Sequence, residues 1–172
     1  MKRANATSLN YRPSKFRMTV IPALSVMICS ALTTMLPIIA KSPILPPFGL
    51  MMFVSWRLLR RDAFPIWAGA PLGFFDDLLS GQPVGSSVFL WSVIMIALEA
   101  IEHRFMWRDY WMEWFLAGLT IGLCLIIGLL FANLHGGPTP IEVILPQILV
   151  SILCYPLMAK LCSMLDNLRI GR

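Results

Sequence analysis

Charged side chains are scarce in this sequence. Only 13% of its 172 residues are Asp, Glu, Lys or Arg, whereas 58% are hydrophobic and the mean hydropathy is +0.74. A water-soluble domain of this size cannot cover its core with so little charged surface, so the lipid bilayer must be the solvent for most of the chain. The composition therefore predicts an all-α membrane protein that crosses the bilayer several times.

The sequence also lacks a cysteine pattern that would hold a metal or a disulfide framework. No two cysteines form a Cys-x-x-Cys pair, and all of them lie in or beside apolar segments, where a free cysteine behaves as a small hydrophobic residue. These four residues are Cys29, Cys124, Cys154 and Cys162. We therefore expect neither disulfide bonds nor a zinc site.

Histidine is rare as well, and each of the two histidines leaves one alternative open. Glu99 and His103 are one helical turn apart and could share a metal, although an ion-pair cluster at the inner end of this helix explains them better. Ser86 or Ser87 could pair with His135, but no catalytic serine motif surrounds either serine. We expect no cofactor, no metal and no catalytic activity.

Long apolar segments fill what remains of the chain. Segment 114–134 carries no charge over a length that crosses roughly 30 Å of hydrocarbon at about 1.5 Å per residue. The weakest segment, 44–59, begins with Pro46 and Pro47 and contains Arg57. We expect a bundle of six transmembrane helices, at 19–40, 44–59, 63–79, 84–101, 114–134 and 143–159.

The positive charges are confined to alternate gaps between these segments. Of the 14 basic residues, all but Lys41 lie in the N-terminal tail, in the connection between the second and third spans (counted from Arg57, at the end of the second span), after the fourth span or in the C-terminal segment. This distribution follows the positive-inside rule and predicts that both termini are cytoplasmic. Topology and anionic lipid headgroups explain the net charge of +5, so no nucleic-acid partner is expected.

No stretch between the spans is long enough for a separate soluble domain. Residues 1–18 form a polar cytoplasmic tail, and residues 19–172 form the six-helix transmembrane domain. The first span is longer than the apolar region of a signal peptide and is best explained as a retained anchor. Aromatic residues among charges are typical of an interfacial belt, although a partner surface stays open here; they are Trp107, Tyr110, Trp111 and Trp114.

Two carboxylates, Asp76 and Asp77, interrupt the third span near its outer end. A turn rich in Gly and Pro follows and leads into the fourth span, so a carboxylate here can accept hydrogen bonds from the free backbone N–H groups. Pro83 presets the helix entry, and Gly81 and Gly85 allow positive φ or close helix approach. We interpret the aspartates as caps of a structural hairpin, with an ion or proton site and a partner contact as alternatives.

Two pairs of glycines are candidates for helix interfaces. Gly-x-x-x-Gly spacing places two glycines on one helix face, where another backbone can approach closely. Gly69 and Gly73 form one pair in the third span, and Gly118 and Gly122 form the other in the fifth. We expect these faces to pack within the chain, with packing between chains as the alternative.

Prolines within spans predict bends in the third and sixth helices. The third span contains Pro65 and Pro71, and the sixth contains Pro146 and Pro156. Bent helices would suit a bundle that encloses a cavity.

The residues from 73 to 85, here called the hallmark motif, read GFFDDLLSGQPVG. They resemble the hallmark of the MreD rod shape-determining family, which is a glycine, a few apolar residues, Asp-Leu-apolar-Ser-Gly, a small or proline position and an apolar-Gly pair. Asp76 is an additional acid. The residues that fall on the family positions are Asp77, Ser80, Gly81 and Gly85, and Pro83 lies in the same motif.

The resemblance implies a non-catalytic scaffold in the bacterial inner membrane that helps control peptidoglycan synthesis and cell shape. Its implied partners are MreC above all, together with MreB, the polymerase RodA and the penicillin-binding transpeptidase of RodA. It also implies a fold similar to the six-helix S-components of energy-coupling-factor transporters, so a vitamin-binding subunit is the alternative. The first span lacks a sustained stripe of small residues, which disfavours that alternative. Association with a second copy stays open.

Overall fold

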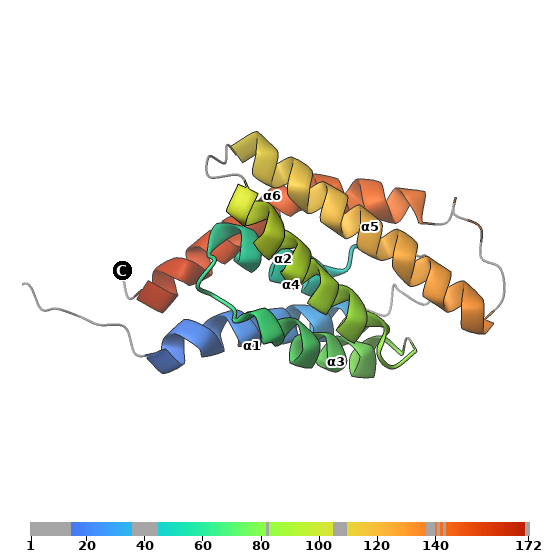
Figure 1. Cartoon of the computed structure of the whole chain (residues 1–172), viewed down its shortest axis with the longest axis horizontal. Coiled ribbons are helices and arrows are strands. Elements are labelled where there is room, and N and C mark those ends of the chain that lie inside the picture. Colours follow the sequence, from blue (N-terminus) through green and yellow to red (C-terminus); the bar gives the residue numbers. More distant parts are fainter. Residues whose placement is uncertain are drawn as a thin grey trace, which may run out of the picture.

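The described part of the chain is all-helical. A computed structural model describes residues 15–35, 45–81, 83–104, 110–136, 140, 142 and 144–170. These residues form six α-helices and one 3-10 helix, which are arranged as in Figure 1. In chain order they are α1 (Lys15–Met35), α2 (Phe48–Leu59), η2 (Ile66–Ala68), α3 (Gly69–Ser80), α4 (Ser86–Arg104), α5 (Tyr110–Gly136) and α6 (Leu145–Ile170). The helical class predicted from composition is confirmed.

Some sequence features lie outside the described residues. Most of the polar tail, Lys41 and Trp107 belong to this group, as do the side chains of His103 and His135. The metal pair and the serine–histidine pair considered above therefore each include one side chain outside the described part.

Three helices are long and apolar enough to cross a membrane, namely Arg17–Met35, Tyr110–Leu134 and Leu145–Ile170. The apolar helices Phe48–Leu59 and Ser86–Ile101 are shorter. A helix of 12 residues such as α2 is about 18 Å long, well short of roughly 30 Å of hydrocarbon. The chain thus has the helices of a membrane protein, and the count of six spans stays a prediction.

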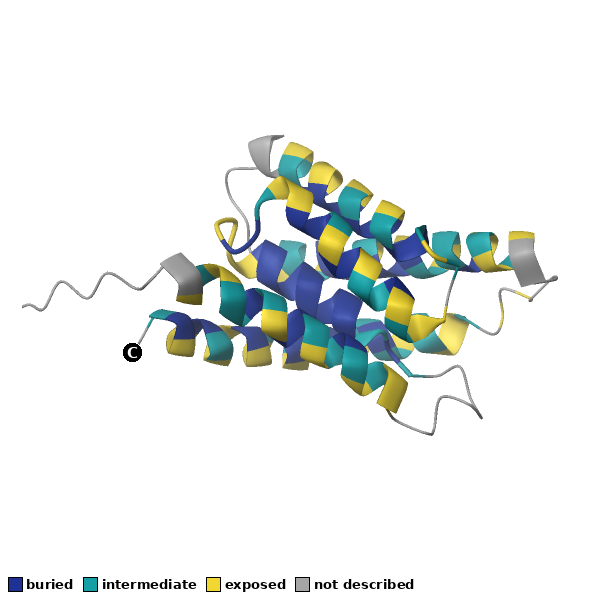
Figure 2. Cartoon of the chain, turned by 90° about the horizontal axis from the view of Figure 1, so that it is seen from below, coloured by how far each residue is buried: buried dark blue, intermediate teal, exposed yellow. Residues whose placement is uncertain are grey.

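The short helix α2 lies at the centre of the bundle. It packs against α1, α4, α5 and α6. The other five α-helices form a closed ring around it, because α1 contacts α3, α3 contacts α4, α4 contacts α5, α5 contacts α6, and α6 contacts α1. Figure 2 shows the buried residues gathered in the middle of the bundle, with exposed residues on the surrounding helices. Every residue of α2 from Gly49 to Leu58 is buried. The weakest span of the sequence is therefore the most enclosed helix of the structure.

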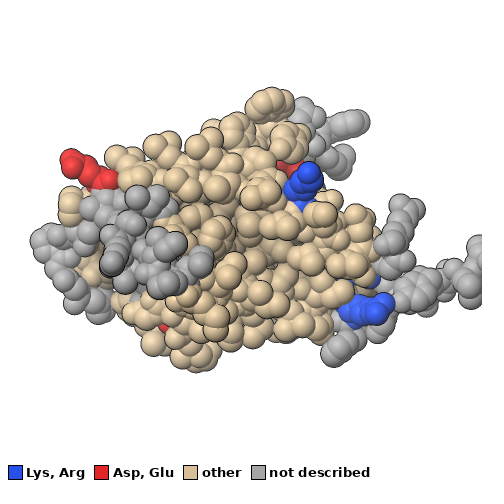
Figure 3. Space-filling view, turned by 180° about the vertical axis from the view of Figure 1, so that it is seen from behind, with Lys and Arg blue, Asp and Glu red and all other residues tan. Residues whose placement is uncertain are grey.

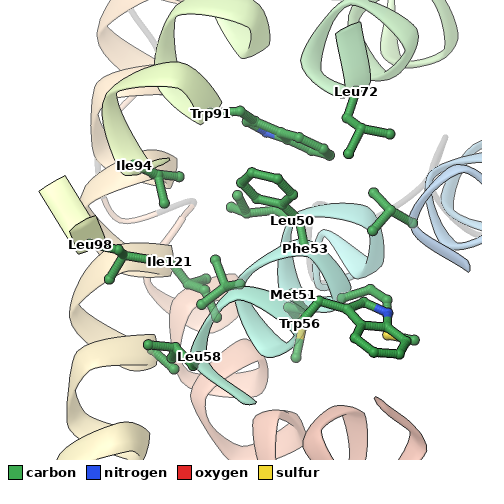
Figure 4. Close-up of a cluster of buried hydrophobic side chains, with 14 of the residues drawn as sticks. Leu50, Met51, Phe53, Trp56, Leu58, Leu72, Trp91, Ile94, Leu98 and Ile121 are labelled. Carbon is green, nitrogen blue, oxygen red and sulfur yellow. The ribbon is translucent and has the colours of Figure 1, made fainter. Parts of the chain in front are cut away.

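Aromatic and sulfur-containing side chains of α2 fill the core (Figure 4). Phe53 stacks on Trp91 of α4 with ring centroids 4.7 Å apart. Trp56 is fully buried and its Nε1 donates a hydrogen bond to Ser25 Oγ of α1 at 2.8 Å. Because lipid tails are as apolar as the core, burial alone gives little driving force inside a bilayer, so close packing and such hydrogen bonds must define the arrangement.

Two sequence interpretations need correction at the C-terminal ends of α2 and α6. Arg57 is not a loop residue, because it lies within α2 and is only 1% exposed. The sixth helix does not end at 159, since α6 continues to Ile170 and carries Lys160 and Arg169. The hydropathy pattern ended the span too early because it counted Arg169 as solvent-facing, whereas the structure buries Arg169 in ion pairs with Asp62 and Asp166.

The positions of the prolines in the structure also correct the prediction of bends in the third and sixth helices. Pro65 precedes η2, and Pro71 and Pro146 lie in the first turns of α3 and α6, where a missing N–H breaks no intrahelical bond. Pro22 in α1 and Pro156 in α6 are interior to their helices. The sequence-based reason for a bend therefore applies at Pro156 and not at the three others.

Pro156 shapes the contact between α5 and α6. A proline has no N–H, so the carbonyl four residues earlier, on Ile152, loses its helical donor. Trp114 of α5 replaces that donor, because its Nε1 donates to Ile152 O at 3.1 Å. This hydrogen bond shows that Trp114 contributes to packing inside the bundle, whereas Tyr110 and Trp111 stay exposed on the same helix, as in the predicted belt.

We expect Trp114→Phe to lower the free energy of unfolding by about 0.5–1.5 kcal/mol, because Ile152 O loses its donor. In a Pro156→Ala background residue 156 supplies its own N–H to that carbonyl, so the same substitution should cost clearly less. Thermal unfolding of the four proteins in mild detergent measures this double-mutant cycle. Equal effects of Trp114→Phe in both backgrounds would contradict the donor replacement.

Candidate functional site

The hallmark motif is organised around Asp77, which is only 2% exposed. Its Oδ2 accepts hydrogen bonds from Gly85 N at 2.7 Å and from Val88 N at 3.4 Å. Its Oδ1 accepts from Ser87 N at 2.9 Å and from Ser86 Oγ at 3.2 Å. Both carboxylate oxygens are therefore occupied by donors at the beginning of α4.

This carboxylate replaces a missing helix cap. Gly85 O accepts the first helical hydrogen bond of α4, from Phe89 N at 3.0 Å, so Gly85 stands where a capping side chain would be. Gly85 has no side chain and a φ of 105°, a conformation that suits glycine. Asp77 reaches across from α3 to the N–H groups that a cap would satisfy, and its charge complements the positive end of α4.

The other motif residues form the connection itself. Gly81 ends α3 with a φ of 66°, the left-handed conformation common after a helix. Pro83 O accepts a hydrogen bond from Ser86 N at 3.1 Å, which closes the turn before α4. Ser80 is exposed at the last position of α3. The structure thus brings the residues of the motif into one hairpin between α3 and α4.

The glycine pair of α3 lies where this helix meets the backbone of α4. Gly69 and Gly73 are both buried. A Cβ on Gly69 would come within 2.7 Å of Trp91 O, and a Cβ on Gly73 would come within 2.6 Å of Ser87 O. Any side chain at either position would force the two helices apart. This close approach holds Asp77 at the distance from α4 that its hydrogen bonds need.

The glycine face of α3 packs within the chain, as expected from the sequence, and not against a second copy, which was the alternative. Gly73, which is also the first residue of the hallmark motif, and Gly69 face α4 of the same chain, so they are not available to a second copy. Their role is therefore structural and internal to the hairpin. The spacing alone could not decide this, because it shows that a face is flat and does not show which helix covers it.

The second pair, Gly118 and Gly122, also faces a helix of the same chain. A Cβ at residue 118 would meet Ile152 Cγ1 at 3.4 Å, and one at residue 122 would meet Ile148 Cγ2 at 3.9 Å. Both isoleucines belong to α6, and both distances are close to ordinary van der Waals contact. The α6 helix covers this face within the chain, and the fit is looser than at the glycines of α3.

A groove of about 460 Å³ lies beside the hairpin. Its lining is mostly apolar and comes from the turn, α4 and α5. The lining residues are Pro83, Val84, Gly85, Ser86, Phe89 and Phe131.

At the opposite end of the bundle, six charged residues form what we call the charge cluster. Arg169 of α6 is 2% exposed, donates to Asp62 at 2.8 Å and to Asp166 at 3.3 Å, and lies over the Trp56 ring at 5.9 Å. Arg60 also donates to Asp166, at 2.8 Å. The cluster comprises Arg57, Arg60, Asp62, Glu99, Asp166 and Arg169, with Arg57 donating to Glu99. It ties α6 to the end of α2.

Sequence reasoning missed most of this cluster. It expected ion pairing around Glu99, but the partner seen for Glu99 is Arg57 of α2. Asp62, Asp166 and Arg169 lie outside the expected spans at 63–79 and 143–159. The i, i+3 spacing of Asp166 and Arg169 was the available signal for a continued helix.

The outer surface of the bundle is largely apolar. In Figure 3 the basic side chains visible on one face lie toward the end where α1 begins, and most of the rest of that face carries no charge. On α6 the exposed apolar residues recur along the whole helix. They are Leu145, Leu149, Leu153, Leu157, Leu161, Met164 and Leu168. A surface of this kind suits contact with lipid or with other membrane helices.

One known protein family matches most of this chain, including the hairpin of α3 and α4. A family model described as rod shape-determining protein MreD matches residues 14–165. The chain belongs to the MreD family. Comparisons with curated proteins and with solved structures gave no match. The resemblance drawn from the hallmark motif is confirmed, and this MreD-family chain is a shape-determining membrane component.

We expect Asp77→Leu to destabilise this MreD-family protein strongly, because each backbone donor left without an acceptor costs roughly 1–3 kcal/mol. Because Asn has the shape of Asp and keeps one acceptor oxygen, a capping role considered without the structure predicts that Asp77→Asn is mild. The structure instead predicts an intermediate effect, because both oxygens face backbone N–H groups and an Asn would turn its NH₂ toward one of them.

Protein level in membranes and thermal unfolding in detergent measure the two variants. Ser80→Ala, at an exposed position of the same motif, is the matched control and should behave as the unmodified protein. An Asp77→Leu protein with full abundance and unchanged unfolding temperature would show that the cap is not structural.

Proposed function

We propose that this chain is a non-catalytic scaffold of the elongation complex in the bacterial inner membrane. In this proposal it binds MreC, associates with MreB, RodA and the penicillin-binding transpeptidase of RodA, and helps control peptidoglycan synthesis. It has six spans and both termini in the cytoplasm. The family match over residues 14–165 carries the proposal, since the family is one of shape-determining membrane components.

The chemistry of the hallmark motif supports a structural role. Its buried carboxylate, Asp77, has both oxygens occupied by donors of the same chain, and Ser86 and Ser87 direct their hydroxyl groups to Asp77 and Asp76. These groups hold helices together. The motif therefore favours a protein that acts through its shape and surface.

The arrangement of the ends supports the proposed topology. Figure 1 shows that α1 begins and α6 ends at the same end of the bundle. The arginines of the charge cluster lie there too, and Arg17 is exposed at the beginning of α1. Basic residues at one end of a membrane bundle favour a cytoplasmic location for that end.

The MreC contact is expected on helix faces that the bundle leaves open. Gly118 and Gly122 already face α6, so they are poor candidates. The exposed apolar side of α5, with Phe115, Leu119 and Leu123, offers a face for a membrane helix of MreC. The alternative of a vitamin-binding transporter subunit gains no support from the comparisons.

Depletion of the protein in a rod-shaped cell should round the cells and disperse MreC, because the complex would lose its membrane scaffold. Microscopy of labelled MreC measures both effects. In affinity purification under mild detergent, Leu119→Trp together with Leu123→Trp should reduce MreC recovery, whereas the covered control Gly122→Ala should not. Rod shape that survives depletion, or MreC recovery unchanged by substitutions on every exposed helix face, would contradict the scaffold role.

Reporter fusions test the topology. A fusion after Arg172 and one inserted within 135–139 should report opposite sides of the membrane, because an even number of spans places both termini in the cytoplasm and the fifth connection outside. Finding both reporters on the same side would refute the topology.

A further inference from the structure

The hairpin of α3 and α4 presents a short apolar face on the outside of the bundle. On η2 and α3 the exposed large apolar side chains run from Ile66 to Leu78, a distance of about 20 Å along the two helices. Exposed polar residues limit this stretch at both ends. The Asp62 side chain, which precedes it, is 61% exposed, and Ser80, which follows it, is exposed at the end of α3.

The adjoining helix α4 has an apolar face of similar length. Its exposed large apolar side chains are Phe89, Val93 and Ile96. Glu99 follows them, and its side chain is 38% exposed. The distance from the beginning of α4 at Ser86 to Glu99 is about 20 Å. Because a tilted helix covers less of the membrane thickness than its own length, the α3–α4 face covers at most this thickness.

The side of the bundle formed by α5 and α6 is taller. On α5 the exposed large apolar side chains run from Phe115 to Leu134, about 29 Å along the helix. On α6 they run from Leu145 to Leu168, about 35 Å, and Lys160 within this stretch has a long side chain that can extend toward the lipid headgroups. Tilt alone can match these two helices to roughly 30 Å of hydrocarbon, whereas it cannot lengthen the α3–α4 face.

We propose that the α3–α4 face binds a locally thinned bilayer, in which the two headgroup layers lie about 10 Å closer together than in an ordinary bilayer. In a bilayer of ordinary thickness, exposed carboxylates at the limit of this face would lie in hydrocarbon, where a charged side chain is costly. Thinning brings Asp62 and Glu99 to the headgroups, and lipid adapts in this way at a modest cost per ångström. The inference rests on the proposed topology, in which α3 and α4 both cross the membrane.

Thermal unfolding of the purified full chain in phosphatidylcholine vesicles tests the proposal. The vesicles differ only in the length of their monounsaturated chains, from about 14 to about 22 carbons, and therefore in hydrocarbon thickness. We expect the unfolding temperature to be highest in the shorter lipids and to fall by on the order of 5 °C in the longest, because thick bilayers are harder to thin.

Three variants test whether the effect belongs to the α3–α4 face. Leu78→Gln shortens this face by about one helical turn, so the unfolding temperature should fall more steeply with lipid length. Ser80→Leu lengthens the face and should make the fall shallower. Leu145→Gln is the matched control, because it removes an exposed leucine at the beginning of α6, where about 29 Å of apolar face remains, and it should retain the slope of the unmodified protein.

An unfolding temperature that rises with lipid length, or that is independent of it, would overturn the proposal. Equal slopes for Leu78→Gln and Leu145→Gln would do so as well, since they would show that the short face is not the cause. If Leu78→Gln does not fold, the comparison of Ser80→Leu with the unmodified protein decides the outcome. Reporter fusions test the topology independently, so reporters on opposite sides together with no preference for thin bilayers would refute this inference alone.

Discussion

The enclosure of α2 on every side constrains the rest of the bundle. A helix of about 18 Å is shorter than roughly 30 Å of hydrocarbon, so the unpaired backbone groups at its ends would be exposed to lipid without a protein cover. Only surrounding protein can cover them, and the ring of α1, α3, α4, α5 and α6 provides that cover. The outer faces of the ring can then be apolar, while polar groups are kept for the inside.

Polar contacts fix the ring because lipid offers no hydrophobic force that would hold helices together. Trp56 joins α2 to α1, Trp114 joins α5 to α6, and Asp77 joins α3 to α4. Each of these contacts is a hydrogen bond to a polar group that has no partner within its own helix or that would be buried without one. The charge cluster does the same at the opposite end, where Arg169 draws the end of α6 onto Trp56.

The pairing of polar groups inside the chain also bears on function. The carboxylate of the hallmark motif, Asp77, is occupied inside the chain by donors of the hairpin that it holds together. In the proposed scaffold role, the outer surface and the spacing of the helices are what remains for binding partners. Asp76, the extra acid next to it, also contacts α4, because its Oδ2 accepts a hydrogen bond from Ser87 Oγ.

Composition and charge pattern alone determined the helical membrane class, because few charges and long apolar segments leave no other solvent than lipid. The hallmark motif pointed to the family, and the position of Asp77 before a Gly/Pro turn predicted the kind of partner it finds. Hydropathy could not reveal that α2 is central, that α6 continues to Ile170, or that Arg57 and Arg169 are buried. Glycine spacing could not reveal that Gly73 meets the backbone of α4 within the same chain. Sequence patterns treat every charge as solvated and every apolar residue as lipid-facing, whereas burial and pairing depend on residues that come together only in the folded bundle.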